Sequence, residues 1–265
     1  MPKLTVTVIT RNEATNLPAA LESVRWADEI VVVDSESTDD TVAIARRFTD
    51  RVIVRPWPGY VEQKNFAAGQ AQHDWILSID ADERVSAPLA DEIKTLLAHP
   101  PTAVGYRLPR VTFHLGRWIR STDWYPDYQL RLYDRRHGAW TGRYVHESVR
   151  VSGAAGQLRG ELQHYAYRDI AHHFQTMDRY TTLAARQMYE DGRRANWFDV
   201  LVHPRLAFFR NYILRGGIRD GMPGLIISAM NGYYVGLKFA KLWELCSPSI
   251  STPPGPGAAD RTRSS

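Results

Sequence analysis

Short apolar runs alternate with helical patterns through the first hundred residues, and this alternation constrains the fold more than any other feature. Each run is short and rich in apolar and β-branched residues, as strands buried on both faces of a sheet are. The runs recur every ~22–26 residues, which is the spacing of βαβ units. They are Leu4–Ile9, Ile30–Val33, Arg51–Val54 and Trp75–Ile79. The sequence therefore predicts an α/β fold with a Rossmann-like, mostly parallel sheet and flanking helices.

The pattern changes twice further along the chain. It becomes irregular after about residue 111, and a helical period returns over residues 169–192. Residues 196–245 are rich in aromatic residues, glycine and arginine, and the end of the chain is rich in Pro, Gly and Ser. Compositions of the latter kind bury too little apolar surface to fold. We therefore expect an α/β domain over 1–168, a helical extension over 169–245 and a disordered tail over 246–265.

The composition excludes several classes of protein. Of the 265 residues, 44% are hydrophobic and 23% are charged, which is the balance of a globular protein and not of a disordered or fibrous chain. The single cysteine, Cys246, excludes an intramolecular disulfide and is compatible with a reducing cytosol. The first residues lack the layout of a signal peptide. No run of ~20 apolar residues occurs, so we do not expect a simple transmembrane helix.

Acidic residues follow the fourth predicted strand directly. The segment WILSIDADE delivers Asp80, Ala81 and Asp82 at the carboxyl end of that strand. In open α/β sheets this is the edge at which ligands bind. Two carboxylates two residues apart can reach one Mg²⁺ or Mn²⁺ ion, since these cations prefer oxygen ligands. Taken alone, the pattern fits a solvated acidic turn equally well.

Further polar residues lie near the same predicted edge. Asp34 ends the second strand, where an acid commonly binds the ribose or base of a nucleotide. Lys64 lies on the predicted helix before the fourth strand and either meets a phosphate or ribose or is a solvated charge. Arg131, in the later segment QLRLY, either faces phosphates or the surface. The residues expected to line the crevice from the first strand are Thr10, Asn12 and Glu13.

The spacing of four segments resembles one known family. The segments are TVITRNE, VVVDSESTDDT, QKNFA and WILSIDADE. In these, over roughly residues 3–150, the chain resembles the family 2 glycosyltransferases, inverting enzymes with a GT-A fold. It is most similar to the bacterial lipopolysaccharide core β-glucosyltransferases, which share DADE, QLRLY, VHE and RYTTLAA.

The resemblance implies a nucleotide-sugar site at the strand ends. Asp82, with a contribution from Asp80, would bind a divalent cation that bridges the diphosphate. This ion would stabilise the charge that develops as the sugar–phosphate bond breaks. Base and ribose would contact the residues of the first two strand ends, and Lys64 would lie near the ribose or phosphate. The residues expected to contact the donor are Thr10, Asn12, Glu13, Asp34, Ser35, Lys64, Asp80 and Ala81.

An inverting transferase also needs a general base for the acceptor hydroxyl. Family members often use an acid of a Glu-Asp pair that follows the metal-binding acids, here Asp80 and Asp82. The one such pair after these residues is Glu190–Asp191, which lies within a predicted helix. Two candidates remain, Glu147 in the segment YVHES and Asp127 in WYPDYQLRL. We favour Glu147, and we expect its neighbour His146 to orient an acid or to pack.

The C-terminal part of the chain is basic and aromatic. Most of the net charge of +4 lies within residues 203–245. Basic residues beside aromatic and aliphatic ones suit the surface of an anionic membrane. Glycine and Pro223 within 221–237 disfavour a straight spanning helix. We therefore expect residues 196–245 to lie on the membrane; the alternative is that they pack on the catalytic domain or on a second subunit.

These features together predict an enzyme of the glycosyltransferase class. It would transfer a hexose from a nucleotide-diphosphate sugar, expected to be a UDP-sugar, to a glycolipid or glycan such as the lipopolysaccharide core. It would act on the cytoplasmic face of the inner membrane without binding nucleic acid, for which no motif is present. Two alternatives remain: a non-catalytic sugar-nucleotide-binding scaffold at the membrane, and a sugar nucleotidyltransferase. The latter usually has a glycine-rich loop after the first strand, where this chain has TRNEATNL.

Overall fold

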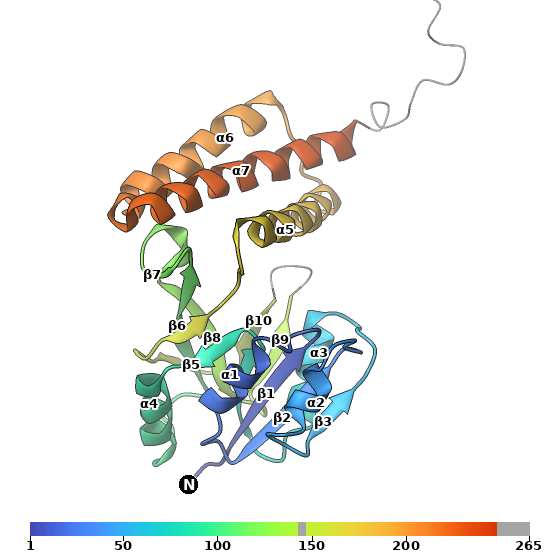
Figure 1. The fold of residues 1–265 in the computed structure, drawn as a ribbon, viewed down its shortest axis with the longest axis vertical. Coiled ribbons are helices and arrows are strands. Elements are labelled where there is room, and N and C mark those ends of the chain that lie inside the picture. Colours follow the sequence, from blue (N-terminus) through green and yellow to red (C-terminus); the bar gives the residue numbers. More distant parts are fainter. Residues whose placement is uncertain (143–146, 248–265) are drawn as a thin grey trace, which may run out of the picture.

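The structure, a computed structural model, describes residues 1–142 and 147–247. It has two parts: a β-sheet flanked by helices, which contains the N-terminus, and a layer of three helices at one end of the sheet (Figure 1). The division expected at residue 168 stays a prediction. Of the tail predicted to be disordered, Cys246 ends the last helix, and residues 248–265 lie outside the described residues.

The four strands predicted in the first hundred residues form one half of the sheet. They are β1 (Leu4–Thr10), β2 (Glu29–Asp34), β3 (Val52–Val54) and β4 (Trp75–Asp80). β1 lies between β2 and β4, and β3 pairs with β2, all in parallel. This half has the architecture that the alternation of strands and helices predicts.

The other half combines parallel pairs of strands with antiparallel ones, so the sheet as a whole is mixed. Its strands are β5 (Glu83–Val85), β6 (Gly105–His114), β7 (Arg117–Ile119), β8 (Asp127–Asp134), β11 (Ala155–Gln157) and β12 (Leu162–His164). The order is β3-β2-β1-β4-β8-β6-β12-β5, and β7 and β11 also pair with β6. β8 runs antiparallel to both β4 and β6, whereas β11 and β12 run parallel to β6. The prediction of a mostly parallel sheet was therefore too simple, because short turns replace crossover helices in the irregular region.

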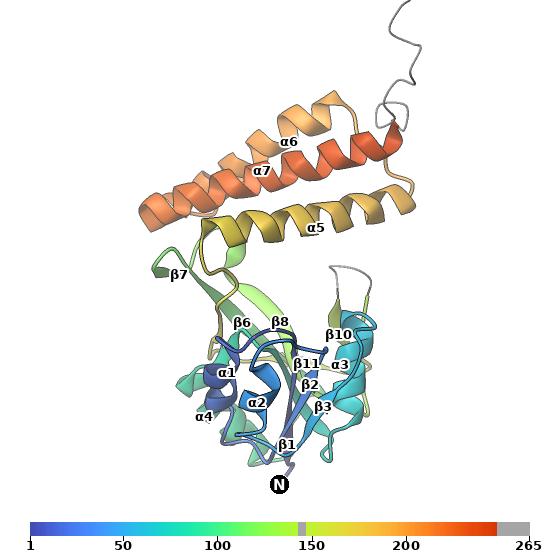
Figure 2. The same cartoon turned by 45° about the vertical axis from the view of Figure 1, so that its right-hand side comes forward.

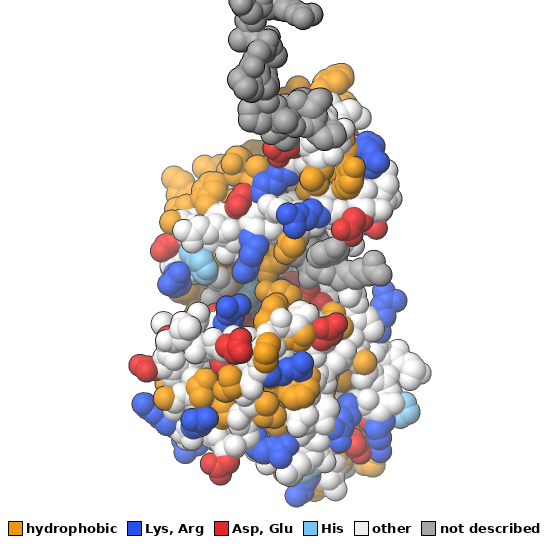
Figure 3. All heavy atoms as spheres, turned by 90° about the vertical axis from the view of Figure 1, so that its right-hand side faces the viewer, with side chains coloured by type: hydrophobic (Ala, Val, Ile, Leu, Met, Phe, Trp, Pro, Cys, Tyr) orange, Lys and Arg blue, Asp and Glu red, His pale blue; other side chains and the backbone are white. Residues whose placement is uncertain are grey.

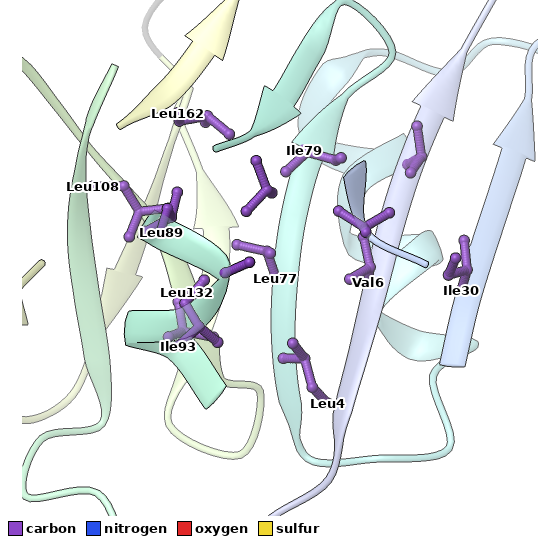
Figure 4. Packing of buried hydrophobic residues seen from close by; sticks show 14 of the residues in the cluster. Leu4, Val6, Ile30, Leu77, Ile79, Leu89, Ile93, Leu108, Leu132 and Leu162 are labelled. Atoms are coloured by element: carbon purple, nitrogen blue, oxygen red, sulfur yellow. The ribbon is translucent and has the colours of Figure 1, made fainter. Parts of the chain in front are cut away.

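Helices cover both faces of the sheet. They are α1 (Leu17–Ser23), α2 (Thr41–Ala45), α3 (Tyr60–Gly69) and α4 (Ala87–Leu97). α1, α2 and α4 share the main core with inward-facing residues such as Val6, Leu77 and Leu132. Figure 4 shows part of this packing, with Leu89 and Ile93 of α4 against the strands. α3 packs on the opposite face of the sheet. There Ala67 contacts Ile9 of β1 and Val31 and Val33 of β2. A strand buried on both faces carries mostly apolar and β-branched residues, which explains these runs; Thr5 and Thr7 of β1 are buried as well.

The remaining elements are a separate hairpin and the helical layer. The hairpin consists of β9 (Gly138–Thr141) and β10 (Ser148–Val151). The layer consists of α5 (Ile170–Glu190), α6 (Trp197–Phe209) and α7 (Gly221–Cys246), with α7 packed against both others (Figure 2). None of the helices described here is both long and apolar enough to span a bilayer.

Polar contacts fasten the helical layer to the sheet part near β7. Asp220, just before α7, is buried, and its carboxylate pairs with Arg117 (3.0 Å) and accepts a hydrogen bond from Ser121 (2.5 Å). The backbone N–H of Thr122 donates to the carbonyl of Arg215 at 2.9 Å. Because the Asp220 carboxylate is buried, losing these partners would leave it unpaired at a high cost, so the contacts hold the layer in a defined position over the sheet.

Candidate active site

The carboxyl ends of β1, β2 and β4 bring the predicted site residues to one edge of the sheet. In the parallel register, Thr10 pairs with Asp34 and Ile9 pairs with Asp80. The three strand ends are therefore neighbours, and the loops that follow them face the helical layer (Figure 1). This is the edge at which open α/β sheets bind ligands.

Asp34 is fully buried at the end of β2. Its carboxylate accepts hydrogen bonds from the backbone N–H of Ser37, at 2.8 Å, and from the Ser37 hydroxyl. Each oxygen keeps a free lone pair. Because Asp34 is fully buried, a ribose hydroxyl can reach these lone pairs only after the residues around the carboxylate have moved.

Two other predicted donor contacts take part in the structure of the loops. Asn12 has a positive φ of 54°, and its side-chain oxygen accepts a hydrogen bond from the N–H of Thr38 at 2.8 Å. Ser35 is buried, and its hydroxyl accepts one from the side chain of Gln63 in α3 at 3.0 Å. Both side chains thus hold the β1 and β2 loops in shape. The buried hydroxyl of Thr10, in contrast, has no hydrogen-bond partner among the described residues.

Glu13 faces the acidic segment after β4. Burial raises the pKa of its carboxyl above the ordinary value, and the negative charge of Asp82 raises it further; a 2.9 Å hydrogen bond from Asn16 opposes the rise. Two acids close enough to influence each other's protonation suit a site that receives a cation or a hydroxyl donor.

Asp80 is held between two basic side chains. The Lys64 ammonium lies 2.9 Å from one carboxylate oxygen, and the Arg131 guanidinium lies 3.0 Å from the other. Burial alone would raise the pKa of Asp80, but these two cations hold it well below the ordinary value. Lys64 also lies 4.2 Å from the centre of the Trp140 ring, a cation–π contact. Asp80 is therefore ionised, and both of its oxygens are engaged.

Asp82 is more open than Asp80. Its side chain is 26% exposed, and one oxygen lies 3.4 Å from the imidazole of His164. Burial acts to raise the pKa of Asp82, but His164 lowers it below the ordinary value. Ala81, between the two acids, packs its methyl group into the main core, so only its backbone can face a ligand. Within residues 1–142 and 147–247, no cluster of three or more potential ligands could hold a metal ion by itself.

A buried network that the sequence did not reveal supports these acids. Glu83 is fully buried, and one of its oxygens accepts hydrogen bonds from Arg110 at 3.2 Å and Arg131 at 3.0 Å. Its other oxygen accepts one from the N–H of Asp80 at 2.9 Å. Two nitrogens of Arg131 are buried with no hydrogen-bond partner among the described residues. The position of Arg131, left open by the sequence, is therefore inside the site and not on the surface.

The two candidate bases differ in how their oxygens are used. One oxygen of Asp127 accepts two hydrogen bonds from Arg110, at 2.6 and 2.9 Å, and the other accepts one from Gln129 at 2.6 Å. Glu147, just before β10, is partly buried, and its Oε2 atom has no hydrogen-bond partner among the described residues. Glu147 therefore has a carboxylate oxygen without a donor among the described residues, whereas both oxygens of Asp127 are engaged. His146, the neighbour singled out from the sequence, lies outside the described residues.

We expect Glu83→Gln to lower the free energy of unfolding by about 3 kcal/mol, because it removes one partner of a buried ion-pair network. Chemical denaturation of the full chain measures this loss. The matched control is Glu22→Gln, which removes an exposed pair with Arg25 and should cost less than about 1 kcal/mol. Equal, small losses for the two variants would show that the network contributes no net stability.

Comparison with known proteins agrees with this geometry. A sequence profile described as glycosyl transferase family 2 matches residues 5–159. The lipopolysaccharide core biosynthesis glycosyltransferase LpsC of Rhizobium meliloti is 32% identical over 253 residues, covering 92% of this chain and 94% of LpsC. An uncharacterized glycosyltransferase of Rickettsia felis is 32% identical over 258 residues, covering 92% of this chain and 90% of the relative.

A solved structure has a similar fold. The mannosyltransferase PcManGT of Pyrobaculum calidifontis aligns with a TM-score of 0.55 at 16% sequence identity, covering 92% of this chain and 88% of that one. At that identity the likeness concerns the fold alone. The family profile spans more than half of the chain, and the relatives match it over nearly their whole length. This chain therefore belongs to glycosyl transferase family 2 and is a glycosyltransferase.

Proposed function

We propose that this enzyme transfers a hexose from a nucleotide-diphosphate sugar to a hydroxyl group of a glycolipid or cell-surface glycan, with inversion at the anomeric carbon. The observation that carries the proposal is the ionised, partly exposed Asp82 at the end of β4, beside the polar ends of β1 and β2. The similarity to LpsC, whose name refers to lipopolysaccharide core biosynthesis, supports an acceptor of that kind.

For the donor, we assign the nucleoside to the ends of β1 and β2, near Thr10, Glu13 and Asp34. Thr10 has a buried hydroxyl without a partner among the described residues, as expected of a group that a ligand completes. PcManGT is a protein of similar fold that was solved with GDP-Man and Mn²⁺. For this chain we expect a UDP-sugar, and the test is binding of UDP against GDP in the presence of Mn²⁺.

The residues at the end of β4 fit a divalent cation completed by the diphosphate. Mg²⁺ is usually held by one or two carboxylates together with substrate phosphates, so a closed protein cage is not required. Asp82 is the principal ligand in this proposal, because both oxygens of Asp80 are engaged by Lys64 and Arg131. Bound there, the ion would supply positive charge to the leaving diphosphate.

Lys64 and Arg131 add fixed positive charge beside that position. Both are buried, and both are oriented by Asp80 before any substrate binds. Charges that are oriented in advance stabilise a developing negative charge without reorganisation during the reaction. We propose that Asp80 acts mainly by positioning these two cations, and that it shares the metal ion only if one of them turns to the phosphates.

Glu147 is the proposed general base. The acceptor hydroxyl gives its proton to the Glu147 carboxylate while its oxygen attacks the anomeric carbon from the face opposite the diphosphate. The bond between that carbon and the diphosphate oxygen breaks, and its electron pair leaves with the diphosphate. The free carboxylate oxygen of Glu147 supports this role, whereas the carboxylate of Asp127 is engaged by Arg110.

The alternatives raised by the sequence are disfavoured. Membership of glycosyl transferase family 2 removes the sugar nucleotidyltransferase. A non-catalytic scaffold would lack a general base. The proposed base, Glu147, stands in for the Glu-Asp pair that family members often use.

We further propose that the helical layer binds the cytoplasmic face of the inner membrane. α6 has no buried residue, and Trp197, Leu214 and Met222 are 72%, 69% and 65% exposed. Apolar side chains gather over the helical part in Figure 3. Exposed arginines accompany them at positions 205, 210, 215 and 219. Apolar area with basic residues around it is what binds anionic lipid surfaces.

Asp82→Asn should lower transfer by about 10²-fold or more, because it removes one preorganised charge and the proposed metal ligand. The measurement is sugar transfer from UDP-sugars to extracted glycolipid with Mn²⁺, and EDTA should abolish the wild-type activity. Asp91→Asn, an exposed acid on α4, is the matched control and should retain full activity. Undiminished turnover by Asp82→Asn in EDTA would refute the metal role.

Glu147→Gln should lower turnover by ~10²-fold or more while donor binding stays intact, since an amide keeps the size but accepts no proton. Asp127→Asn in parallel should affect turnover less. Single-turnover rates together with calorimetric binding of UDP separate the two effects. The assignment of the base is wrong if only the Asp127 variant loses turnover.

Replacing Trp197 and Leu214 by Glu in the full chain should weaken binding to anionic liposomes by about tenfold or more, since each removes the burial of a large apolar side chain. Sedimentation with vesicles of phosphatidylglycerol and phosphatidylethanolamine measures this. Val54→Glu, at an exposed apolar position on β3 in the sheet part, is the control and should bind as wild type does. Wild-type protein that stays in the supernatant at low salt would exclude the membrane proposal.

A further inference from the structure

A cavity of about 310 Å³ lies where the helical layer meets the sheet part. Its walls come from both parts of the molecule. Trp124 and Tyr167 belong to the segments after β7 and before α5, and His173 and Tyr180 belong to α5. Asn231 and Tyr234 of α7 close it from the other side. A cavity of this size and partly apolar lining is typical of a small-molecule site.

The cavity adjoins Asp82 through the segment that follows β12. His164 contacts the Asp82 carboxylate, and the N–H of Tyr165 donates to the Asp82 carbonyl at 2.9 Å. Tyr167, two residues further, lines the cavity. Burial raises the pKa of Tyr167 to about 12, and the charges of Arg110 and Asp82 also act on it, so its hydroxyl lies within electrostatic reach of the site.

A second connection runs to the basic side of the site. Tyr180 lines the cavity and interacts with the hydroxyl of Tyr60 in α3. The Tyr60 ring in turn lies 5.9 Å from the ammonium of Lys64, which pairs with Asp80. The cavity therefore borders the candidate site from two sides.

The residues that line the cavity from the sheet part follow strands on the opposite side of β4 from the nucleoside position. Asp34 ends β2, which precedes β4 in the strand order, whereas β6, β7 and β12 follow it. Trp124 and Tyr167 come directly after the latter strands. A donor that extends from Asp34 to Asp82 therefore has its diphosphate between the nucleoside and this cavity. The cavity is placed for the molecule that receives the sugar.

The chemistry of the lining suits an uncharged sugar. Tyr167 stacks on His173 with ring centres 4.0 Å apart, and Trp124 lies 5.6 Å from Tyr167. The negative faces of such rings attract the C–H groups of a pyranose. Asn231 and Tyr234 supply groups that hydrogen-bond to hydroxyls. Among the described residues that line the cavity there is no Asp, Glu, Lys or Arg, and burial together with His114 and His172 lowers the pKa of His173 to about 4, so its imidazole is neutral at pH 7.

We propose that this cavity is the subsite for the acceptor and that it binds a neutral pyranose ring between Tyr167 and α7. The inference rests on the proposed function and names the part of the acceptor that the enzyme recognises. Because the helical layer forms one wall, the same helices that are proposed to contact the membrane would present a lipid-linked sugar to Asp82 and Glu147.

The test is binding of three neutral probes to the full chain: methyl β-D-glucopyranoside, methyl α-D-mannopyranoside and methyl β-D-galactopyranoside. Saturation-transfer difference NMR titrations measure their affinities. For whichever probe binds the wild-type protein, Tyr234→Phe and Asn231→Leu should each lower the affinity by about fivefold, which corresponds to the loss of one hydrogen bond. Tyr233→Phe is the matched control on α7, since Tyr233 is 52% exposed and packs on Phe174; it should bind as wild type does.

Calorimetric binding of UDP with Mn²⁺, run on the same proteins, separates this inference from the proposed function. Unchanged UDP affinity in the Tyr234 and Asn231 variants supports an acceptor subsite. The inference is overturned if no probe binds wild type, or if the two variants bind the probe as tightly as the Tyr233 control does. It is also overturned if the variants lose affinity for a UDP-sugar but not for UDP, because the cavity would then hold the donor sugar. Probe binding without any nucleotide binding would refute the proposed donor while leaving a sugar site in the cavity.

Discussion

Glu83 and the two arginines that it binds hold the end of β4 in place. Glu83 fixes the backbone of Asp80 and accepts hydrogen bonds from Arg110 on β6 and Arg131 on β8. Arg131 then reaches Asp80, which also holds Lys64 of α3. Four strands, β4, β5, β6 and β8, and the helix α3 thus meet at one buried group of charges. Since each unpaired charge would be expensive to bury, the network restrains the strand ends on which the donor and metal proposals depend.

This arrangement divides the two acids of the DADE segment between two roles. Asp80 is engaged by cations on both oxygens, whereas Asp82 faces a histidine and is partly exposed. The difference follows from strand geometry, because Asp80 is the last residue of β4 and lies against β8, while Asp82 lies in the turn before β5. In the proposed mechanism the first acid arranges positive charge and the second binds the metal ion.

The helical layer combines two surfaces with different chemistry. Its outer side exposes large apolar residues and arginines, and its inner side contributes α5 and α7 to the aromatic cavity. A layer fastened by the buried Asp220 keeps both surfaces in a fixed relation to Asp82. A lipid-linked acceptor could therefore rest on the outer side while its sugar occupies the inner one. α7 borders the cavity and α6 exposes large apolar residues, and the expectation that residues 196–245 lie on the membrane stays a prediction.

Much of the site could be predicted because its residues follow buried strands. A strand buried on both faces is mostly apolar, so its end is visible where a run of polar residues begins, and parallel strands place those residues on one edge. Thr10, Asp34 and Asp80 were found in this way. The second half of the sheet could not be predicted as well, since its strands are short and antiparallel pairing leaves no regular spacing along the chain.

The sequence by itself determined the strands of β1 to β4, the edge at which their polar residues gather and, through its motifs, the family. Only the tertiary structure decided which of those polar residues are free. Asn12 and Ser35 hold neighbouring loops, whereas the hydroxyl of Thr10 has no partner within residues 1–142 and 147–247. The contacts of Asp82 with His164 and of Glu83 with Arg110 join residues far apart in the chain. The order of polar and apolar residues along a segment shows where a strand ends and which residues there are polar. The partner of a buried charge depends on how segments far apart in the sequence pack together.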